Sequence, residues 1–338
     1  PILILLLGGG FYFLIYSRLV PLRHFGHALK ILTGKYDNPD EPGQLRHYQA
    51  LSTALAGTIG MGNVSGVAVA ITMGGPGAIF WMWISAVVGM STKFFTSSLA
   101  IMFRGKDSDG VLQGGPMYFI IKGLGSKWKP LAIFFSSCAM IGALPVFNVN
   151  QLTQALNDIL LKPNGVEVTD YTNLGIGFFL VIITSIVVLG GLKRIGKVTA
   201  RLVPSMVILY FILVVIILIV NIDVVPKYFL MIFTDAFSAD FINEESVIGG
   251  VVGALIILGI KRGAFSNEAG VGTAPMAHGA AKTDEPIREG LVAMLGPFID
   301  TIIVCTLTAL AILVTGVWQT SDTNGVSLTA TAFGNAMP

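Results

Sequence analysis

The stretch Gly57-Thr58-Ile59-Gly60-Met61-Gly62-Asn63-Val64-Ser65-Gly66 decides the fold, because it interrupts an apolar run, 51–73, that is long enough to span a bilayer. Three glycines fall within the six residues 57–62, and each glycine costs about 1 kcal/mol relative to alanine inside a helix. Unwound backbone at membrane depth survives only where it is buried in protein or lines a polar cavity. Such a central interruption is typical of the binding site of a secondary transporter.

The composition places the whole chain in a membrane. Of its 338 residues, 54% are hydrophobic and only 12% are charged, whereas ordinary soluble domains carry about 25% charged residues. Cys138 and Cys305 both lie inside apolar runs, so a disulfide framework is not expected. The sequence therefore predicts an all-α polytopic membrane protein.

Further apolar segments predict the other membrane helices. A leading helix ends at about Tyr16, and later helices are expected at 51–73, 76–103, 130–160, 171–190, 196–220, 246–280 and 287–316. The segment 18–50 has the mixed basic pattern of an amphipathic interfacial stretch, and 225–241 is typical of an aromatic-rich surface or re-entrant helix. The chain opens inside an apolar stretch and stops abruptly, so both ends are expected to be cut.

The basic residues predict the orientation. Four segments that the expected helices place on one side hold 18 of the 21 Lys and Arg residues: 18–50, 104–129, 193–201 and 261–288. By the positive-inside rule these loops are cytoplasmic, in a multi-pass protein of the inner (plasma) membrane. The helices at 51–73 and 246–280 then cross the membrane in opposite directions, as an inverted repeat of five-helix units requires.

Several motifs, in order, resemble those of the alanine/glycine:cation symporter family. They are 57–66, Gly74-Gly-Pro-Gly-Ala-Ile-Phe-Trp-Met-Trp83, Gly89-Met-Ser-Thr-Lys93, Arg104-Gly-Lys-Asp107, Gln113-Gly-Gly-Pro-Met-Tyr118 and Lys261-Arg-Gly-Ala-Phe-Ser-Asn-Glu-Ala-Gly270. The resemblance covers nearly the whole chain. It implies a leucine-transporter-like inverted-repeat fold with ten core helices, of which the first and sixth are discontinuous. It also implies uptake of alanine or glycine driven by Na⁺.

The resemblance predicts four parts for the chain. Residues 1–50 form the leading helix and a cytoplasmic interfacial segment, and 51–220 form the first five-helix repeat. Residues 221–245 form an extracellular loop with a short helix, and 246–338 begin the second repeat. The fold is thus expected to be C-terminally truncated, lacking helices 8 to 10. Because the family takes part of its Na⁺ site and one pocket wall from helix 8, these residues alone are not expected to transport.

The break in 51–73 supplies the first candidate site residues. It frees N–H groups at a positive dipole end and carbonyls at a negative end. The candidates for the substrate carboxylate and pocket are Gly60, Met61, Gly62, Asn63 and Val64; those for the cation are Ala56, Thr58, Ile59 and, by the resemblance, the Asn63 side-chain oxygen. An alternative is that these glycines only permit close helix packing, as the spacing of Gly62 and Gly66 allows.

The segment 246–280 is expected to break as well. Only 14 residues, 247–260, precede Lys261-Arg262-Gly263, about 21 Å of helix, which is too short for a core of about 30 Å. A break is therefore expected between Gly259 and Gly263, and a second candidate lies at 266–271. Ile257, Leu258 and Gly259 are expected at the substrate. Lys261, Arg262 and Glu268 are candidates for an inner gate, with plain flanking charge as the alternative.

Polar residues inside other spans complete the candidates, because such residues usually face the protein interior or a polar cavity. Phe147, Asn150 and Gln151 are expected to close the pocket and bind the substrate amine, or else to hold helices together by hydrogen bonds. Asp300 is a candidate for the cation pathway, or a structural carboxylate. Lys93 is expected to snorkel partly toward the inner surface.

Other classes of function fit less well. The four histidines, His24, His27, His47 and His278, lie in or near the cytoplasmic segments, and no His or Cys spacing indicates a metal site or an enzyme. A channel would need a continuous pore. The closer rival is a proton-coupled or uncoupled amino-acid exchanger with Asp300 as the proton carrier. The expected partners are a small neutral amino acid, Na⁺ and the lipid bilayer, with no other cofactor and no nucleic acid.

Overall fold

The computed structural model describes residues 2–238, 250–320 and 323–336. In this part of the chain, five helices are long and apolar enough to cross a membrane: Gly77–Met102, Ser126–Asn164, Asp170–Val188, Gly191–Val220 and Pro286–Val314. A bent pair, His47–Thr58 and Met61–Gly74, makes a sixth span when counted together. The prediction of a helical, multi-span membrane protein is confirmed.

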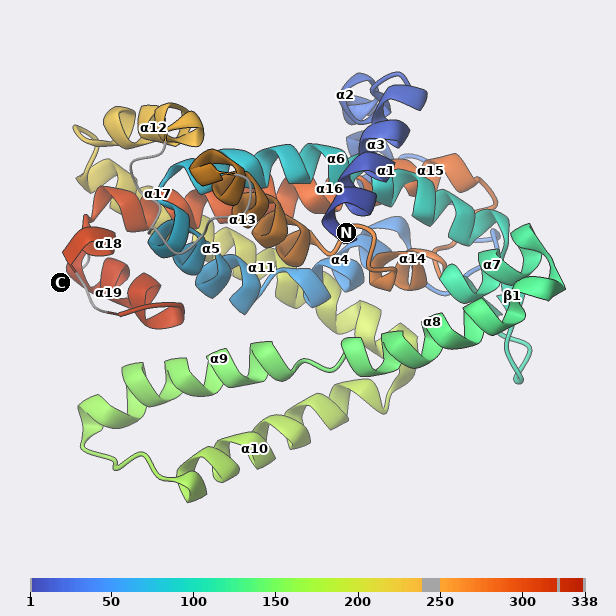
Figure 1. Ribbon diagram of the computed structural model, residues 1–338. Helices are drawn as coiled ribbons and strands as arrows, with labels where there is room; N and C mark the ends of the chain where they lie inside the picture. The colour runs from blue at the N-terminus through green and yellow to red at the C-terminus, as the bar shows by residue number, and fades with distance from the viewer. Residues whose placement is uncertain (1, 239–249, 321–322, 337–338) are drawn as a thin grey trace.

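The elements follow the expected segments closely, as Figure 1 shows. The first part holds α1 (Ile2–Tyr16), α2 (Val20–Arg23), α3 (Phe25–Leu32), α4 (His47–Thr58), α5 (Met61–Gly74), α6 (Gly77–Met102), β1 (Gly105–Lys106), β2 (Leu112–Gln113) and α7 (Pro116–Leu124). The middle holds η1 (Ser126–Trp128), α8 (Lys129–Gly142), α9 (Val146–Leu156), η2 (Asn157–Leu161), η3 (Lys162–Asn164), α10 (Asp170–Val188), α11 (Gly191–Val220), α12 (Val225–Thr234) and η4 (Asp235–Phe237). The last part holds α13 (Gly250–Asn267), α14 (Thr273–His278), α15 (Pro286–Ala293), α16 (Leu295–Pro297), η5 (Phe298–Cys305), α17 (Thr306–Val314), α18 (Val317–Thr320) and α19 (Val326–Ala336).

Helix α6 lies at the centre of the bundle and packs against α13, α15 and α1. The largest apolar cluster joins α5, α6, α13 and α17 through side chains that include Ile71, Met82, Leu255 and Leu313. This rigid core holds the two elements that carry the predicted breaks against a common neighbour.

The predicted break in the first core helix is confirmed. Helix α4 ends at Thr58 and α5 begins at Met61, with a bend of 45° between them. A Cβ added at Gly57, Gly60 or Gly66 would meet nothing within 4 Å, and one at Gly62 would meet only Phe265 at 3.8 Å. These glycines therefore do not serve close packing, and they leave open space around the break.

The break expected between Gly259 and Gly263 is wrong, because α13 runs through both residues without interruption. Here the glycines do serve close packing. A Cβ at Gly259 would lie 2.5 Å from the Ala78 carbonyl oxygen, and one at Gly263 would lie 2.8 Å from Ser85 Cβ. The helix instead ends after Asn267, within the second predicted candidate. Glu268 there has a φ of +51°, and α14 resumes at Thr273.

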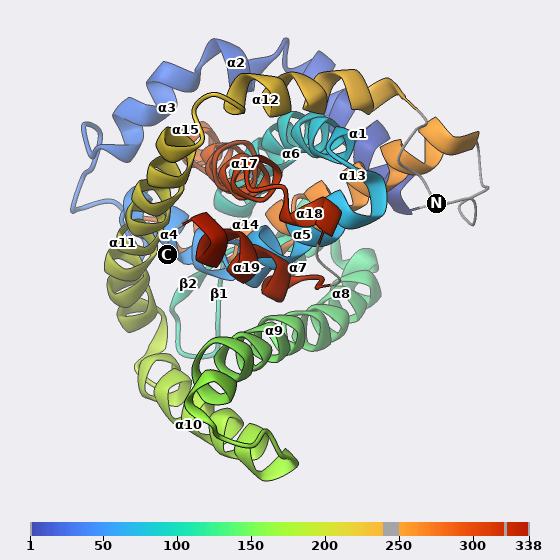
Figure 2. The same ribbon diagram turned by 90° about the vertical axis from the view of Figure 1, so that its left-hand side faces the viewer.

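Helices α9 and α10 form a hairpin that stands apart from the rest of the bundle in both Figure 1 and Figure 2. The span expected at 130–160 extends over Ser126–Asn164 and is interrupted at Pro145, which lies between α8 and α9. Helix α10 has no buried residue and packs only on α9 and α11 among its principal contacts. Its apolar side chains suit a lipid environment.

Parts of the four basic segments meet near one end of the bundle, the end that carries α7 in Figure 1 and is called the basic end below, while α2 and α3 lie farther along the bundle. Arg104 donates hydrogen bonds to the carbonyls of Pro42, Gly279 and Thr283. The Tyr48 hydroxyl donates to the Ala200 carbonyl at 3.0 Å. Helices α12, α18 and α19 lie at the opposite end. The last residues of the expected segment 225–241 lie outside the described residues.

The contrast between the two sets of glycines leads to a stability prediction. Gly259→Ala should lower the free energy of unfolding by about 1–3 kcal/mol, because its Cβ meets backbone that cannot yield. Gly57→Ala should be neutral or stabilise by up to about 1 kcal/mol, because the space is open and alanine favours helix. Denaturant titration in detergent, followed by tryptophan fluorescence, measures both. Equal effects of the two changes would contradict the close contact of α13 with α6.

Candidate substrate and cation site

A cavity of about 330 Å³ lies at the break between α4 and α5 and is called the break cavity below. Its walls come from the break itself, from α9, from α11 and from η5: Ala56, Ile59, Gly60, Met61, Asn63, Val64, Asn148, Leu152, Met206, Val207, Tyr210 and Val304. Six of these residues were predicted at the break. The lining is mostly apolar with a few polar groups, as small-molecule sites usually are.

A buried polar network borders this cavity and is centred on Asp300. Three donors reach its carboxylate: Asn63 Nδ2 at 2.9 Å, Ser266 Oγ at 2.6 Å and Thr301 Oγ1 at 2.7 Å. Asn267 Nδ2 donates in turn to Thr301 Oγ1 at 3.3 Å. All five side chains are buried. This set, the Asp300 network, brings the start of α5, the end of α13 and the π-helical turn η5 to one point.

Asn63 joins the break to the network. Its Oδ1 accepts the Gly60 N–H at 3.0 Å, while its Nδ2 donates to Asp300. Because a backbone N–H can only donate, the amide oxygen must face Gly60, which settles the orientation of the side chain. Asn63 therefore satisfies backbone exposed by the break and presents donors to the carboxylate.

The other candidates for the cation lie close by along α4. Ala56 and Ile59 line the break cavity, and Thr58 is buried with its Oγ1 donating to the Leu55 carbonyl at 3.4 Å. Sequence reasoning missed Ser266 and Thr301, whose hydroxyl oxygens face Asp300. Thr301 could have been predicted, because it directly follows the lone intramembrane Asp300 in the sequence.

Lys93 lies buried near the same network. Only 2% of its surface is exposed, so the expected snorkelling is wrong. Its Nζ lies beside Gly296, 3.3 Å from where a Cβ would stand, and it interacts electrostatically with Asp300 and Glu268. Burying a charge is costly unless opposite charge lies near, and Asp300 and Glu268 are the carboxylates that act on Lys93.

The residues predicted in 130–160 contact α5 either directly or through another side chain. Phe147 packs edge-on against Phe265, with ring centroids 5.4 Å apart, and Phe265 in turn contacts the Gly62 position. Gln151 accepts a hydrogen bond from Ser65 at 2.6 Å and donates to Asn150. The residues of α9 that line the break cavity are Asn148 and Leu152.

The remaining candidates lie away from the break cavity. Leu258 and Gly259 pack against α5 and α6, and Ile257 is 47% exposed. Among the described residues, no ion pair joins Lys261 or Arg262 to Glu268 or to another carboxylate. Glu268 instead accepts a hydrogen bond from Thr273 Oγ1 at 2.6 Å.

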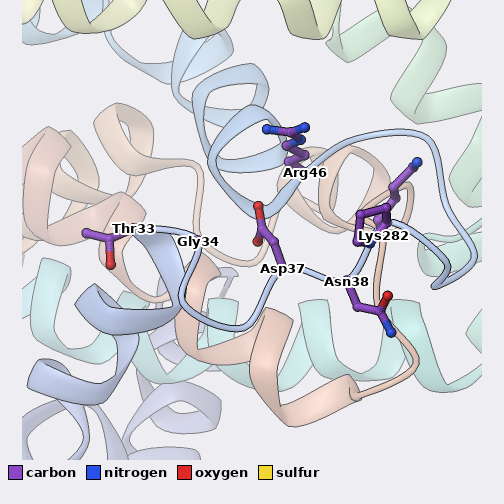
Figure 3. Close-up of a pocket in the computed structure, with 7 residues that line it drawn as sticks. Thr33, Gly34, Asp37, Asn38, Arg46 and Lys282 are labelled. Atoms are coloured by element: carbon purple, nitrogen blue, oxygen red, sulfur yellow. The ribbon is translucent and has the colours of Figure 1, made fainter.

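A second cavity, of about 360 Å³, lies at the basic end and is polar (Figure 3). Thr33, Gly34, Asp37, Asn38, Pro39, Arg46 and Lys282 line it. It contains none of the predicted site residues and lies on loops rather than at a helix break. The break cavity, with the Asp300 network beside it, is therefore the candidate functional site.

A bundle of apolar helices, a helix broken within it and a cavity with a buried polar network at the break define a membrane transporter. The sodium:alanine symporter family matches the chain over residues 1–338. The chain belongs to this family.

Three named relatives are similar to the chain over nearly its whole length. The chain is 42% identical to the sodium/alanine symporter AgcS of Methanococcus maripaludis, over 99% of this chain and 73% of that protein. It is 38% identical to a putative sodium/proton-dependent alanine carrier protein, YrbD, of Bacillus subtilis, over 96% of this chain and 64% of that protein. It is 33% identical to a probable sodium/glutamine symporter, GlnT, of the same organism, over 97% of this chain and 66% of that protein.

The short hydrogen bond from Ser266 to Asp300 predicts a measurable loss. Ser266→Ala should lower the free energy of unfolding by about 2 kcal/mol, because it removes a donor from a buried carboxylate. Ser205→Ala, on the exposed part of α11, removes only a bond to the Leu202 carbonyl of its own helix and should change stability by less than about 0.5 kcal/mol. Denaturant titration in detergent compares the two. A loss at Ser266 no larger than at Ser205 would show that the network is not formed.

Proposed function

We propose that this protein couples the uptake of a small neutral amino acid, alanine or glycine, to the entry of Na⁺ by alternating access. One observation carries the proposal: Asn63 lines the break cavity and also donates to Asp300, so one side chain connects a candidate substrate site with an oxygen-rich network. The name of the AgcS relative, a sodium/alanine symporter, supports the same choice of substrate and ion.

The substrate carboxylate would bind at the first turn of α5. The opening N–H groups of a helix have no acceptor within it and lie at the positive end of its dipole. The N–H groups of Met61 and Gly62 occupy that place. Gly60 and Gly62 have no side chains that would cover them. The apolar walls of the break cavity would then contact the substrate side chain, with Asn148 and Tyr210 as polar groups for its amine.

Na⁺ would bind between the break and the Asp300 network, since it prefers hard oxygen ligands. The closing carbonyls of α4, at Ala56, Thr58 and Ile59, lie at the negative end of a helix dipole. Asp300 adds a carboxylate, and Ser266 and Thr301 add hydroxyl oxygens. Asn63 lies between these groups, and a rotation of its amide would offer its oxygen.

The architecture that we propose for the complete transporter is the leucine-transporter-like inverted repeat. The bent pair α4–α5 and the interrupted pair α13–α14 would be its two discontinuous helices, and Lys261, Arg262 and Glu268 remain candidates for a gate. The concentration of Lys and Arg at the basic end supports a cytoplasmic location for that end, in the inner (plasma) membrane.

Proton coupling is the second candidate. Lys93 and Asp300 are both buried and interact electrostatically, so a proton on Asp300 could take the place of a metal cation. The name of the YrbD relative, a putative sodium/proton-dependent alanine carrier protein, includes this possibility. The two forms of coupling predict different dependences of substrate affinity on Na⁺ and on pH.

Reciprocal coupling between the ligands tests the proposal. In protein reconstituted in vesicles, Na⁺ should lower the Kd for alanine, and alanine should lower the Kd for Na⁺ by the same factor, about fivefold or more. Asn63→Ala should weaken both, because Asn63 borders both sites. Asn148→Ala, which lines the cavity away from the network, should weaken alanine alone. An alanine affinity that ignores Na⁺ and follows pH would replace Na⁺ symport with proton coupling.

The space at Gly62 gives a graded test of the carboxylate site. Gly62→Ala should retain binding of labelled glycine, because its Cβ would stand 3.8 Å from Phe265 in ordinary contact. Gly62→Val should lose most binding, because a β-branched side chain crowds the N–H groups at the start of α5. Binding assays on both purified variants, with expression as the control, decide the matter. Unchanged affinity in Gly62→Val would place the carboxylate elsewhere.

A further inference from the structure

A buried carboxylate at the basic end holds two buried histidines. One oxygen of Glu289 bonds to His47 Nδ1, and the other bonds to His278 Nδ1 at 2.5 Å. The exposed fraction of each of the three side chains is 1% or less. The proposed coupling of substrate and Na⁺ does not use this cluster of one buried carboxylate and two buried imidazoles.

The cluster joins three separate elements. His47 is the first residue of α4, His278 is the last residue of α14, and Glu289 lies in α15. Helix α15 packs against the central α6, so the carboxylate is anchored to the core of the bundle. The two histidines belong to the elements on the basic-end side of the two interruptions.

The backbone joins the same two histidine-bearing segments. The N–H groups of Gln44 and Leu45 donate to the Ala280 carbonyl at 2.8 and 3.1 Å, and Lys282 N–H donates to the Leu45 carbonyl at 2.6 Å. The segments before α4 and after α14 are therefore joined to each other. The two buried Glu289 contacts and the partly exposed ion pair of Arg288 with Glu41 attach them to α15.

The chemistry of the cluster favours two discrete states. An ionised carboxylate out of water costs several kcal/mol unless its oxygens are paired. In the closed arrangement each oxygen has an imidazole partner, while Nε2 of both histidines is buried without a hydrogen-bond partner. If the imidazoles leave, Glu289 must be hydrated, so release of the histidines and entry of water at this end occur together.

Helix α4 connects the cluster to the break cavity. It runs for 12 residues from His47 to Thr58, directly before Ile59 and Gly60 in the cavity wall. A rigid helix of this length transmits a displacement at one end to the other. The position of His47 therefore bears on the shape of the substrate site.

We propose that His47, Glu289 and His278 form a latch that keeps the basic end of the transporter closed by holding α4 and α14 on α15. Release of the latch opens the path from the cytoplasmic side to the break cavity. The inference rests on the proposed function for its role in alternating access, but the closed contact and its release are testable without any substrate. The three residues act as positioning residues, since none of them touches the break cavity.

Hydrogen–deuterium exchange on the full chain in nanodiscs tests the latch directly. Glu289→Ala and the milder Glu289→Gln should raise exchange in α4 and in 273–283 by about tenfold or more, because both elements lose their attachment to α15. Exchange in α10 should not change, because its principal contacts are with α9 and α11 and not with α4 or α14. Arg288→Gln is the comparison variant. Arg288 precedes Glu289 in α15, and its ion pair with Glu41 is partly exposed, so its loss should raise exchange in α4 and α14 by less than about threefold.

A conservative rescue separates the latch from general packing. His47→Ala should raise exchange in α4, whereas His47→Asn should restore the parental rate, because the asparagine Nδ2 can donate from nearly the place of the imidazole Nδ1. Uptake by the complete transporter in vesicles gives a second measurement: a protein that spends a smaller fraction of its time closed at this end should show a higher KM for external alanine. The Asn variant should return that KM to the parental value.

Three results would overturn the inference. One is unchanged exchange in α4 and 273–283 in both Glu289 variants. Another is a uniform rise over the whole chain, which would indicate global destabilisation. The third is equal exchange in His47→Ala and His47→Asn. If instead the exchange results hold and the complete parental transporter does not take up alanine, the latch stands and the proposed substrate falls.

Discussion

The need to satisfy backbone polar groups away from water is the constraint on which this structure depends. The bend between α4 and α5 opens the backbone inside an apolar bundle, and each unsatisfied N–H there costs several kcal/mol. The Asn63 side chain meets this cost at Gly60 and passes the connection on to Asp300. Asp300 also accepts a hydrogen bond from Ser266 at the end of α13, so one carboxylate is hydrogen-bonded to residues at both interruptions. The site exists where the backbone most needs partners.

Glycine has opposite uses in the two interrupted helices. At Gly57, Gly60 and Gly66 the missing side chains leave open space beside the break, which a ligand can occupy. At Gly259 and Gly263 the missing side chains let α13 lie directly on α6, so helix–helix packing stabilises the element and keeps it continuous. Glycine thus leaves a cavity beside one helix and permits close helix–helix packing at the other. The neighbouring helix, and not the glycine, decides which.

Buried charge is arranged in two groups along the same bundle. Asp300, with its three donors and the nearby Lys93, lies at the break, and Glu289, with two histidines, lies at the basic end. Each carboxylate connects elements that are far apart in the chain, and each would have to be hydrated if those elements separated. Such groups contribute little net stability but favour one arrangement over its alternatives. A transporter that changes shape needs contacts of this kind, because they are either complete or broken.

Features that depend on neighbouring residues could be predicted from the amino-acid sequence. Apolar runs predicted the membrane helices, the glycines of 57–66 predicted the break, and Asn63 was recognised at its edge, because propensity and hydropathy act over a few neighbouring residues. Only the tertiary structure decided which glycines of α13 pack, that Lys93 is buried, and which groups surround Asp300. It also brought His47 to Glu289, 242 residues away in the sequence. Those contacts depend on which helices become neighbours, and a linear pattern carries no record of the distance between two helices in space.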